Sequence, residues 1–178
     1  MDEAAGAGFL DNIRLTRDKR WWYMDRAWDD IMRIATEREV QKFSLSSGRQ
    51  LSRYSTHLVG LIGEVVVAKE SGQPFDDRLL LAGDDGHDFE SHGKTINVKT
   101  SCYFDDPHLK VMKKEKLPCD FYVLVAADIP SRRARLVGHA SLEDVMAAKV
   151  RSYGHGIVYS LTESSMRPGL PPCMNRIR

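Results

Sequence analysis

Apolar residues recur every three or four positions over 9–42, a stretch that contains neither Gly nor Pro. This spacing gathers apolar side chains on one side of an α-helix, so it predicts one or two amphipathic helices. A break rich in Ser, at 44–48, follows this stretch. A second helical pattern over 54–70 predicts another helix, and Gly72 is expected to end it.

Beyond Pro74 the pattern changes to short apolar runs separated by turn-forming residues. Runs of this kind are typical of β-strands. We expect one sheet made of the runs at 78–81, 87–90, 95–101, 121–127 and 135–139. Ser141 and Asp144 have the spacing of a helix N-terminus and predict a short helix after the sheet. The segment 167–178 is expected to be a loop or tail.

This order of elements predicts an α/β protein. The length of 178 residues suits one domain. Within it we expect a helical N-terminal extension over 1–50, a core over 51–150 and a C-terminal strand or tail over 151–178.

The composition narrows the classes of partner and compartment. Lys and Arg number 26 against 25 Asp and Glu, which excludes a uniformly basic nucleic-acid coat. Cys102, Cys119 and Cys173 lie far apart, so neither a disulfide framework nor a zinc site is expected, and a cytoplasmic location fits best. No apolar run reaches the roughly 18 residues that cross a bilayer, so no membrane partner is expected.

One group of polar residues carries the candidate chemistry. Alternation along the predicted strand at 95–101 places Asn97 and Lys99 on one face. A hairpin with the preceding strand would bring Asp88 next to both. Oxygen donors beside an ammonium suit Mg²⁺-assisted phosphodiester hydrolysis, in which Lys99 would orient or help deprotonate the attacking water. Glu64, on the predicted helix at 54–70, is the natural additional ligand.

Five segments of the chain resemble, in order, the PD-(D/E)XK nuclease superfamily, and especially its small phage-encoded members. They are GLIGEVVVAK (60–69), GDDGHDFE (83–90), INVKTS (96–101), CDFYVLVA (119–126) and LVGHASLEDV (136–145). The resemblance covers roughly 55–147. In it, Glu64 matches the helix glutamate and Asp88 the first motif aspartate. Asn97 stands at the (D/E) position, and Lys99 matches the lysine.

The resemblance implies a restriction-endonuclease-like fold, a mixed central sheet flanked by helices. It implies a DNA endonuclease that uses Mg²⁺, with Mn²⁺ as a substitute, held by Glu64, Asp88 and Asn97, with Lys99 completing the catalytic set. It further implies DNA as the partner, a phage origin with the host cytoplasm as location, and a homodimer as an arrangement suited to cutting two strands.

Asn97 departs from the family pattern, which has Asp or Glu at this position. An amide keeps an oxygen donor but removes one negative charge, so metal affinity should fall. Three explanations stay open: a naturally weakened enzyme, a pseudonuclease that only binds, or an Asp→Asn change made to inactivate the site. The alternative function is therefore a catalytically inactive DNA-binding or host-directed interaction protein with a nuclease fold.

Two other groups of residues leave alternatives open. Aromatic residues at 21–28 lie among basic residues and either pack in the core, stack on nucleic-acid bases or form a dimer contact. Basic residues at 110–116 and 132–135 are either phosphate contacts or ordinary solvated charge.

Overall fold

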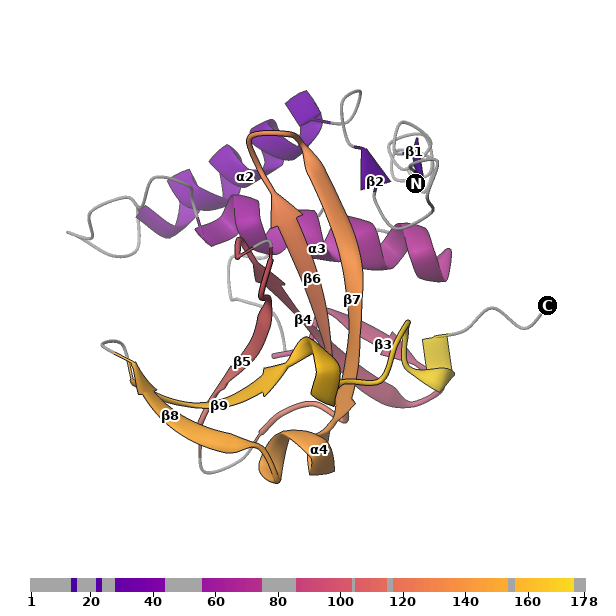
Figure 1. Cartoon of the computed structure of the whole chain (residues 1–178). Coiled ribbons are helices and arrows are strands. Elements are labelled where there is room, and N and C mark those ends of the chain that lie inside the picture. The colour runs from indigo at the N-terminus through magenta and orange to yellow at the C-terminus, as the bar shows by residue number, and fades with distance from the viewer. Residues whose placement is uncertain are drawn as a thin grey trace.

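The computed structural model of the chain shows two β-sheets and a pair of long helices (Figure 1). It describes residues 14–15, 22–23, 28–43, 56–74, 86–103, 105–114, 117–153 and 156–174. The predicted strand at 78–81 lies outside these residues.

The main sheet has six strands in the order β1-β2-β7-β6-β4-β3. Their bounds are β1 (Arg14–Leu15), β2 (Trp22–Tyr23), β3 (Phe89–Ser91), β4 (Lys94–Ser101), β6 (Phe121–Asp128) and β7 (Arg133–Ser141). β4 and β6 run parallel, whereas the other neighbouring pairs are antiparallel. The sheet is therefore mixed, and the predicted α/β class is confirmed. The specific restriction-endonuclease-like arrangement stays a prediction.

A second sheet of three strands, in the order β5-β9-β8, packs against one face of the main sheet (Figure 1). Its strands are β5 (His108–Met112), β8 (Lys149–Tyr153) and β9 (Gly156–Thr162). The described runs that were expected to form one sheet do so as β3, β4, β6 and β7, whereas the strands of this second sheet were not predicted. Every residue of β8 is exposed, so this strand lacks the strong apolar signal that marks buried strands.

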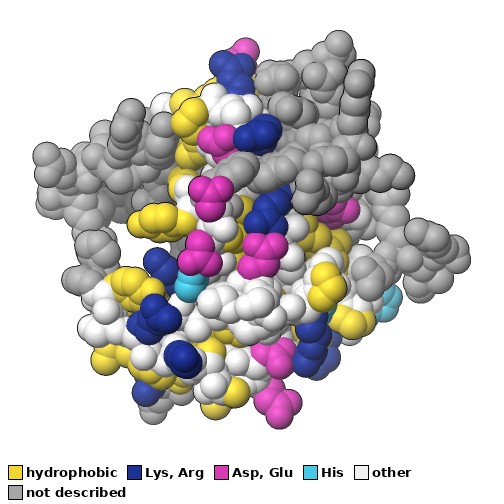
Figure 2. Space-filling model, in the orientation of Figure 1, with side chains coloured by type: hydrophobic (Ala, Val, Ile, Leu, Met, Phe, Trp, Pro, Cys, Tyr) yellow, Lys and Arg dark blue, Asp and Glu magenta, His cyan; other side chains and the backbone are white. Residues whose placement is uncertain are grey.

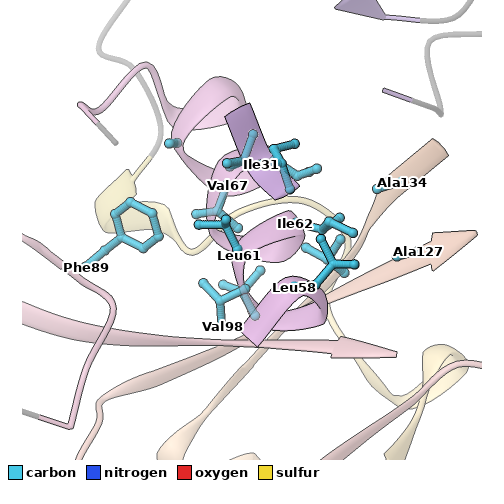
Figure 3. Packing of buried hydrophobic residues seen from close by; sticks show 14 of the residues in the cluster. Ile31, Leu58, Leu61, Ile62, Val67, Phe89, Val98, Ala127 and Ala134 are labelled. Atoms are coloured by element: carbon cyan, nitrogen blue, oxygen red, sulfur yellow. The ribbon is translucent and has the colours of Figure 1, made fainter. Parts of the chain in front are cut away.

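Helices α2 (Trp28–Phe43) and α3 (Thr56–Ser71) cover one face of the main sheet. Ile31 and Ile34 of α2 pack with Leu61 and Ile62 of α3 in the cluster that also contains Val98 of β4 (Figure 3). The helix predicted over 54–70 is confirmed, and Gly72 follows its end in a left-handed conformation with φ of 69°.

The N-terminal prediction needs correction. Trp22 and Tyr23, expected in a helix, form β2 and pair with Ala134 and Arg133 of β7. Aromatic residues favour strands, and β7 offers these two an open edge. α2 begins only at Trp28, which is partly buried and packs against the core with the Arg132 guanidinium 5.4 Å from its ring centroid. Core packing is thus confirmed for Trp28, and α2 is part of the core.

The main sheet is buried on both faces. Val123 and Val125 of β6 belong to the core under the helices, whereas Tyr122 and Leu124 belong to a second core under the β5-β9-β8 sheet. The alternation of side chains along one strand thus feeds two separate cores.

The C-terminal part is more ordered than expected. Helix α4 (Leu142–Met146) begins at Ser141, as predicted, with a complete capping box to Asp144. Two short 3₁₀ helices follow β9, η1 (Glu163–Ser165) and η2 (Pro172–Met174). Leu170 and Met174 are buried in the core under the helices, so the described part of the expected tail belongs to the fold. In the described parts of the chain, no helix is long and apolar enough to span a bilayer.

Candidate active site

The candidate site is built on the hairpin of β3 and β4. His92 and Gly93, with φ of 51° and 68°, form the turn between the two strands. Positive φ at both central residues is typical of a tight hairpin turn. The register pairs Phe89 with Ile96, and the backbone amide of Asp88 donates to the Ile96 carbonyl at 2.9 Å. The predicted hairpin is therefore confirmed.

Asp88 lies directly beside β4. Its Oδ2 accepts a hydrogen bond from the backbone amide of Val98 at 2.5 Å. Val98 stands between Asn97 and Lys99, so this bond holds the carboxylate next to both residues. A hydrogen bond to an ionised carboxylate is among the stronger ones in proteins.

Asn97 orients its amide towards the loop before β3. Its Nδ2 donates to the carbonyl of Gly86 at 3.4 Å, and the Cys119 thiol donates to the same carbonyl at 3.2 Å. Its Oδ1 is buried and finds no hydrogen-bond partner among the described residues. Tyr122 is the neighbour of Asn97 across β4 and β6. Its hydroxyl is likewise buried and without a hydrogen-bond partner among the described residues. Buried polar atoms without partners are rare, and each calls for an explanation.

Lys99 lies on the same face of β4 as Asn97. Across the parallel ladder, these two residues are paired with Leu124 and Tyr122, which face the second sheet. Lys99 is only partly buried. Asn97 and Lys99 thus share one face of β4, as the alternation predicts, and Asp88 is bonded to the backbone of the residue between them.

Glu64 comes from the other side of the sheet. It lies on α3, which packs against the face of β4 that carries Val98 and Thr100. A methyl group at Gly63, the residue before Glu64, would clash with Thr100. The structure therefore places Glu64 on the helix side of β4 and Asn97 on the opposite side. The role of Glu64 as a metal ligand stays a prediction.

The donors on the hairpin suit a hard cation. In the described parts of the chain, no group of three His, Cys, Asp or Glu side chains could hold a metal ion. Asp88 and the unpartnered oxygen of Asn97 nevertheless offer the oxygen donors that Mg²⁺ prefers, and Mg²⁺ usually keeps waters as its remaining ligands. The residues present therefore fit Mg²⁺ in type.

Asp120 supports the start of β4 and was not predicted from the sequence. Its carboxylate accepts from Lys94 Nζ at 2.9 Å, and from the Thr95 amide and hydroxyl at 3.0 Å each. The hydrogen bond from Lys94, followed by those from Thr95, lowers the pKa of Asp120 to about 2. Asp120 directly precedes β6, so it ties together the starts of the two parallel strands. The sequence signal that could have pointed to Asp120 is its position directly before a predicted strand.

Two of the three arginines at 132–135 form ion pairs within the protein. Arg133 pairs with Asp128 at 3.1 Å, and Arg135 forms two hydrogen bonds of 2.7 Å to Glu163. These arrangements favour structural ion pairs over phosphate contacts for these two arginines.

Comparison with known proteins finds no relative. No family model matches the chain, and neither a curated protein nor a solved structure matches it. The resemblance to the PD-(D/E)XK superfamily therefore rests on the motifs and on the residues of the hairpin.

Proposed function

We propose that the chain is a Mg²⁺-dependent DNA endonuclease of the PD-(D/E)XK type, weakened by Asn97. One observation carries this proposal: a carboxylate, an unpartnered amide oxygen and an ammonium share one β-hairpin. Asp88 is held on the Val98 amide, and Asn97 and Lys99 lie on one face of β4 on either side of Val98.

Asp88 and Asn97 would hold the metal ion, whereas Glu64, the third ligand expected from the sequence, lies on the helix side of β4, across the strand from Asn97. Bound Mg²⁺ would supply a more acidic water and would stabilise negative charge on the phosphate. The Val98 amide keeps the Asp88 carboxylate in one orientation. Lys99 would place its ammonium beside the attacking water and offset charge that develops on the phosphate.

Asn97 explains why the activity should be low. An amide oxygen is a weaker ligand for Mg²⁺ than a carboxylate oxygen, and the site loses one negative charge. The side-chain amide of Asn97 also donates a hydrogen bond to the Gly86 carbonyl, which a carboxylate at this position could not do.

That last contact favours a second candidate function. In a nuclease fold, an amide at the (D/E) position that forms a hydrogen bond within the protein suits a function without cutting. Such a protein would bind DNA or a host protein. The lack of a group of three acidic or metal-ligating side chains within the described residues is in keeping with this alternative.

A divalent-metal titration with duplex, branched and single-stranded DNA separates the two functions. We expect slow Mg²⁺-dependent cleavage by the unaltered chain and roughly tenfold faster cleavage by Asn97→Asp, which corresponds to about 1.4 kcal/mol of transition-state stabilisation. Lys99→Ala should lower cleavage by ~100-fold or more, the usual contribution of a positioned proton-transfer group.

The controls use the same chain. Lys69→Ala removes a lysine from the last turn of α3, outside the hairpin, and should leave cleavage unchanged. The double variant Asn97→Asp/Lys99→Ala should lose the gain made by Asn97→Asp alone. DNA binding without products in every variant, Asn97→Asp included, would contradict the nuclease and support the binding protein.

A further inference from the structure

The outer face of the second sheet carries a row of cations. Leu109 and Val111 of β5 point into the core, so Lys110 points outwards. The register places Lys110 and Lys149 on either side of Ser160, and Arg151 beside Val158 in the next outward row. Lys and Arg side chains gather over this sheet in the lower left of Figure 2.

Two tyrosines lie beside these cations. Tyr103 is 70% exposed and Tyr153 is 36% exposed. Lys110 Nζ lies 5.2 Å from the ring centroid of Tyr103 and 4.4 Å from that of Tyr153, so one ammonium contacts both rings. The two tyrosines, Lys110 and Arg151 line an open pocket of about 400 Å³. Burial does not explain the placement of these two exposed rings. Their contacts with the Lys110 ammonium hold them at the surface instead.

The cations of this face are available to an anionic partner. Among the described residues, Lys110, Lys149 and Arg151 enter no ion pair, whereas each arginine of β7 pairs with a carboxylate. Of the two acidic residues at the pocket, Asp106 is engaged by His108 Nε2 at 3.0 Å. Asp105 is the other acidic residue, so the three cations Lys110, Lys149 and Arg151 outnumber the two carboxylates at the pocket.

We propose that the outer face of the β5-β9-β8 sheet binds single-stranded DNA. Bases would stack on Tyr103 and Tyr153, and phosphates would contact Lys110, Lys149 and Arg151. Exposed aromatic rings beside cations suit unpaired bases, because a duplex hides the faces on which rings stack. The choice of DNA over RNA rests on the proposed nuclease function. Tyr103 follows β4 closely, so the strand that carries Lys99 leads towards this face.

Fluorescence anisotropy with a labelled thymidine oligonucleotide of about 15 nucleotides tests the site, a length suited to such surfaces. The measurement is made in EDTA, so that it is independent of metal and of cleavage. We expect tighter binding to this probe than to a duplex of equal length. Tyr103→Ala should weaken binding at least ~fivefold, the low end for one lost base stack. Tyr103→Phe keeps the ring and should bind like the unaltered chain.

The phosphate contacts have a separate readout. The plot of log affinity against log salt has a negative slope. Lys110→Ala and Arg151→Ala should each make this slope less steep by about 0.7, the value for one lost contact to a single strand. Arg33→Ala, on the exposed side of α2 where Arg33 pairs with Glu37, removes one positive charge elsewhere and should leave this slope unchanged.

Several results would overturn the proposal: no measurable binding, equal or tighter binding to the duplex, tighter binding to a uridine oligoribonucleotide, or Tyr103→Ala binding like Tyr103→Phe. Tyr103 is largely exposed, so its replacement should not impair folding. If oligonucleotide binding is found but Asn97→Asp cuts no DNA, the nuclease fails and this site stands. If Asn97→Asp cuts DNA but the tyrosine variants bind normally, this site fails alone.

Discussion

Gly63 on α3 lies so close to Thr100 on β4 that no side chain fits between them. A Cβ at this position would overlap the Thr100 hydroxyl and crowd Val98. The helix therefore approaches the strand of the candidate site more closely than any residue other than glycine would allow.

Gly63→Ala should destabilise the protein by about 1–3 kcal/mol, because overpacking forces the helix and strand apart. The matched control is Gly60→Ala on the same helix, where a Cβ would meet only Glu64 Oε1 at 3.9 Å. That change should stabilise by about 0.5–1 kcal/mol through helix propensity. Urea unfolding of both variants measures the difference, and a Gly63→Ala protein as stable as Gly60→Ala would refute the close contact.

Asp88 should have a structural role that is separable from metal binding. Asp88→Ala leaves the buried Val98 amide without its acceptor and should cost about 1–3 kcal/mol. Asp88→Asn retains an acceptor oxygen and should cost less, while it removes the charge that a metal ion needs. Thermal unfolding without metal compares the two variants. Equal losses of stability would show that the carboxylate charge, and not the hydrogen bond, stabilises the hairpin.

The capping box of α4 gives a third prediction. Ser141 Oγ accepts from the Asp144 amide at 3.2 Å, and Asp144 Oδ2 accepts from the Ser141 amide at 2.8 Å. Ser141→Ala should cost about 1 kcal/mol, the usual value for a lost N-cap. Ser152→Ala, on exposed β8, serves as the control and should stay within about 0.5 kcal/mol of the unaltered chain, as surface substitutions usually do. If both variants unfold at the same urea concentration, the cap contributes nothing measurable.

Acid should weaken the protein through carboxylates that are stabilised in the folded state. The hydrogen bond from Lys94, followed by those from Thr95, holds the pKa of Asp120 at about 2. The unfolded chain binds a proton at Asp near pH ~3.9. The contribution of Asp120 is therefore complete above about pH 4 and is lost as the pH falls towards 2.

Other carboxyls act in the same direction. Hydrogen bonds from Ser131, Ser141 and Arg135, respectively, lower the pKa of Asp128, Asp144 and Glu163. Urea midpoints measured between about pH 5 and pH 2 should fall steadily, because the unfolded chain takes up more protons. Asp120→Asn should show a shallower fall than the unaltered chain. An identical slope in the two proteins would contradict the assignment to Asp120.

Local patterns were sufficient where an element depends on its own residues. Helix α3 follows from its apolar spacing and from Gly72, and both lie within one short segment. The hairpin of β3 and β4 follows from alternation together with the turn at His92 and Gly93. In each case, the residues that determine the structure are neighbours in the sequence.

Distant pairing explains what the sequence analysis missed. Trp22 becomes a strand residue because it pairs with Ala134, more than a hundred positions away. Lys110 joins a sheet because it pairs with Ser160, and β8 joins through β9. β8 is exposed along its whole length, so its hydrogen-bond partner β9, and not an apolar pattern of its own, decides its conformation.

The sequence alone determined that Asn97 and Lys99 share one face of a strand, since successive side chains of any strand alternate between faces. Only the tertiary structure decided which layer covers each face. The close packing of Gly63 places α3 over the side that bears Thr100, and Leu109 and Val111 place the second sheet over the other side. The choice between faces depends on burial of apolar surface from several distant segments, which no short pattern records.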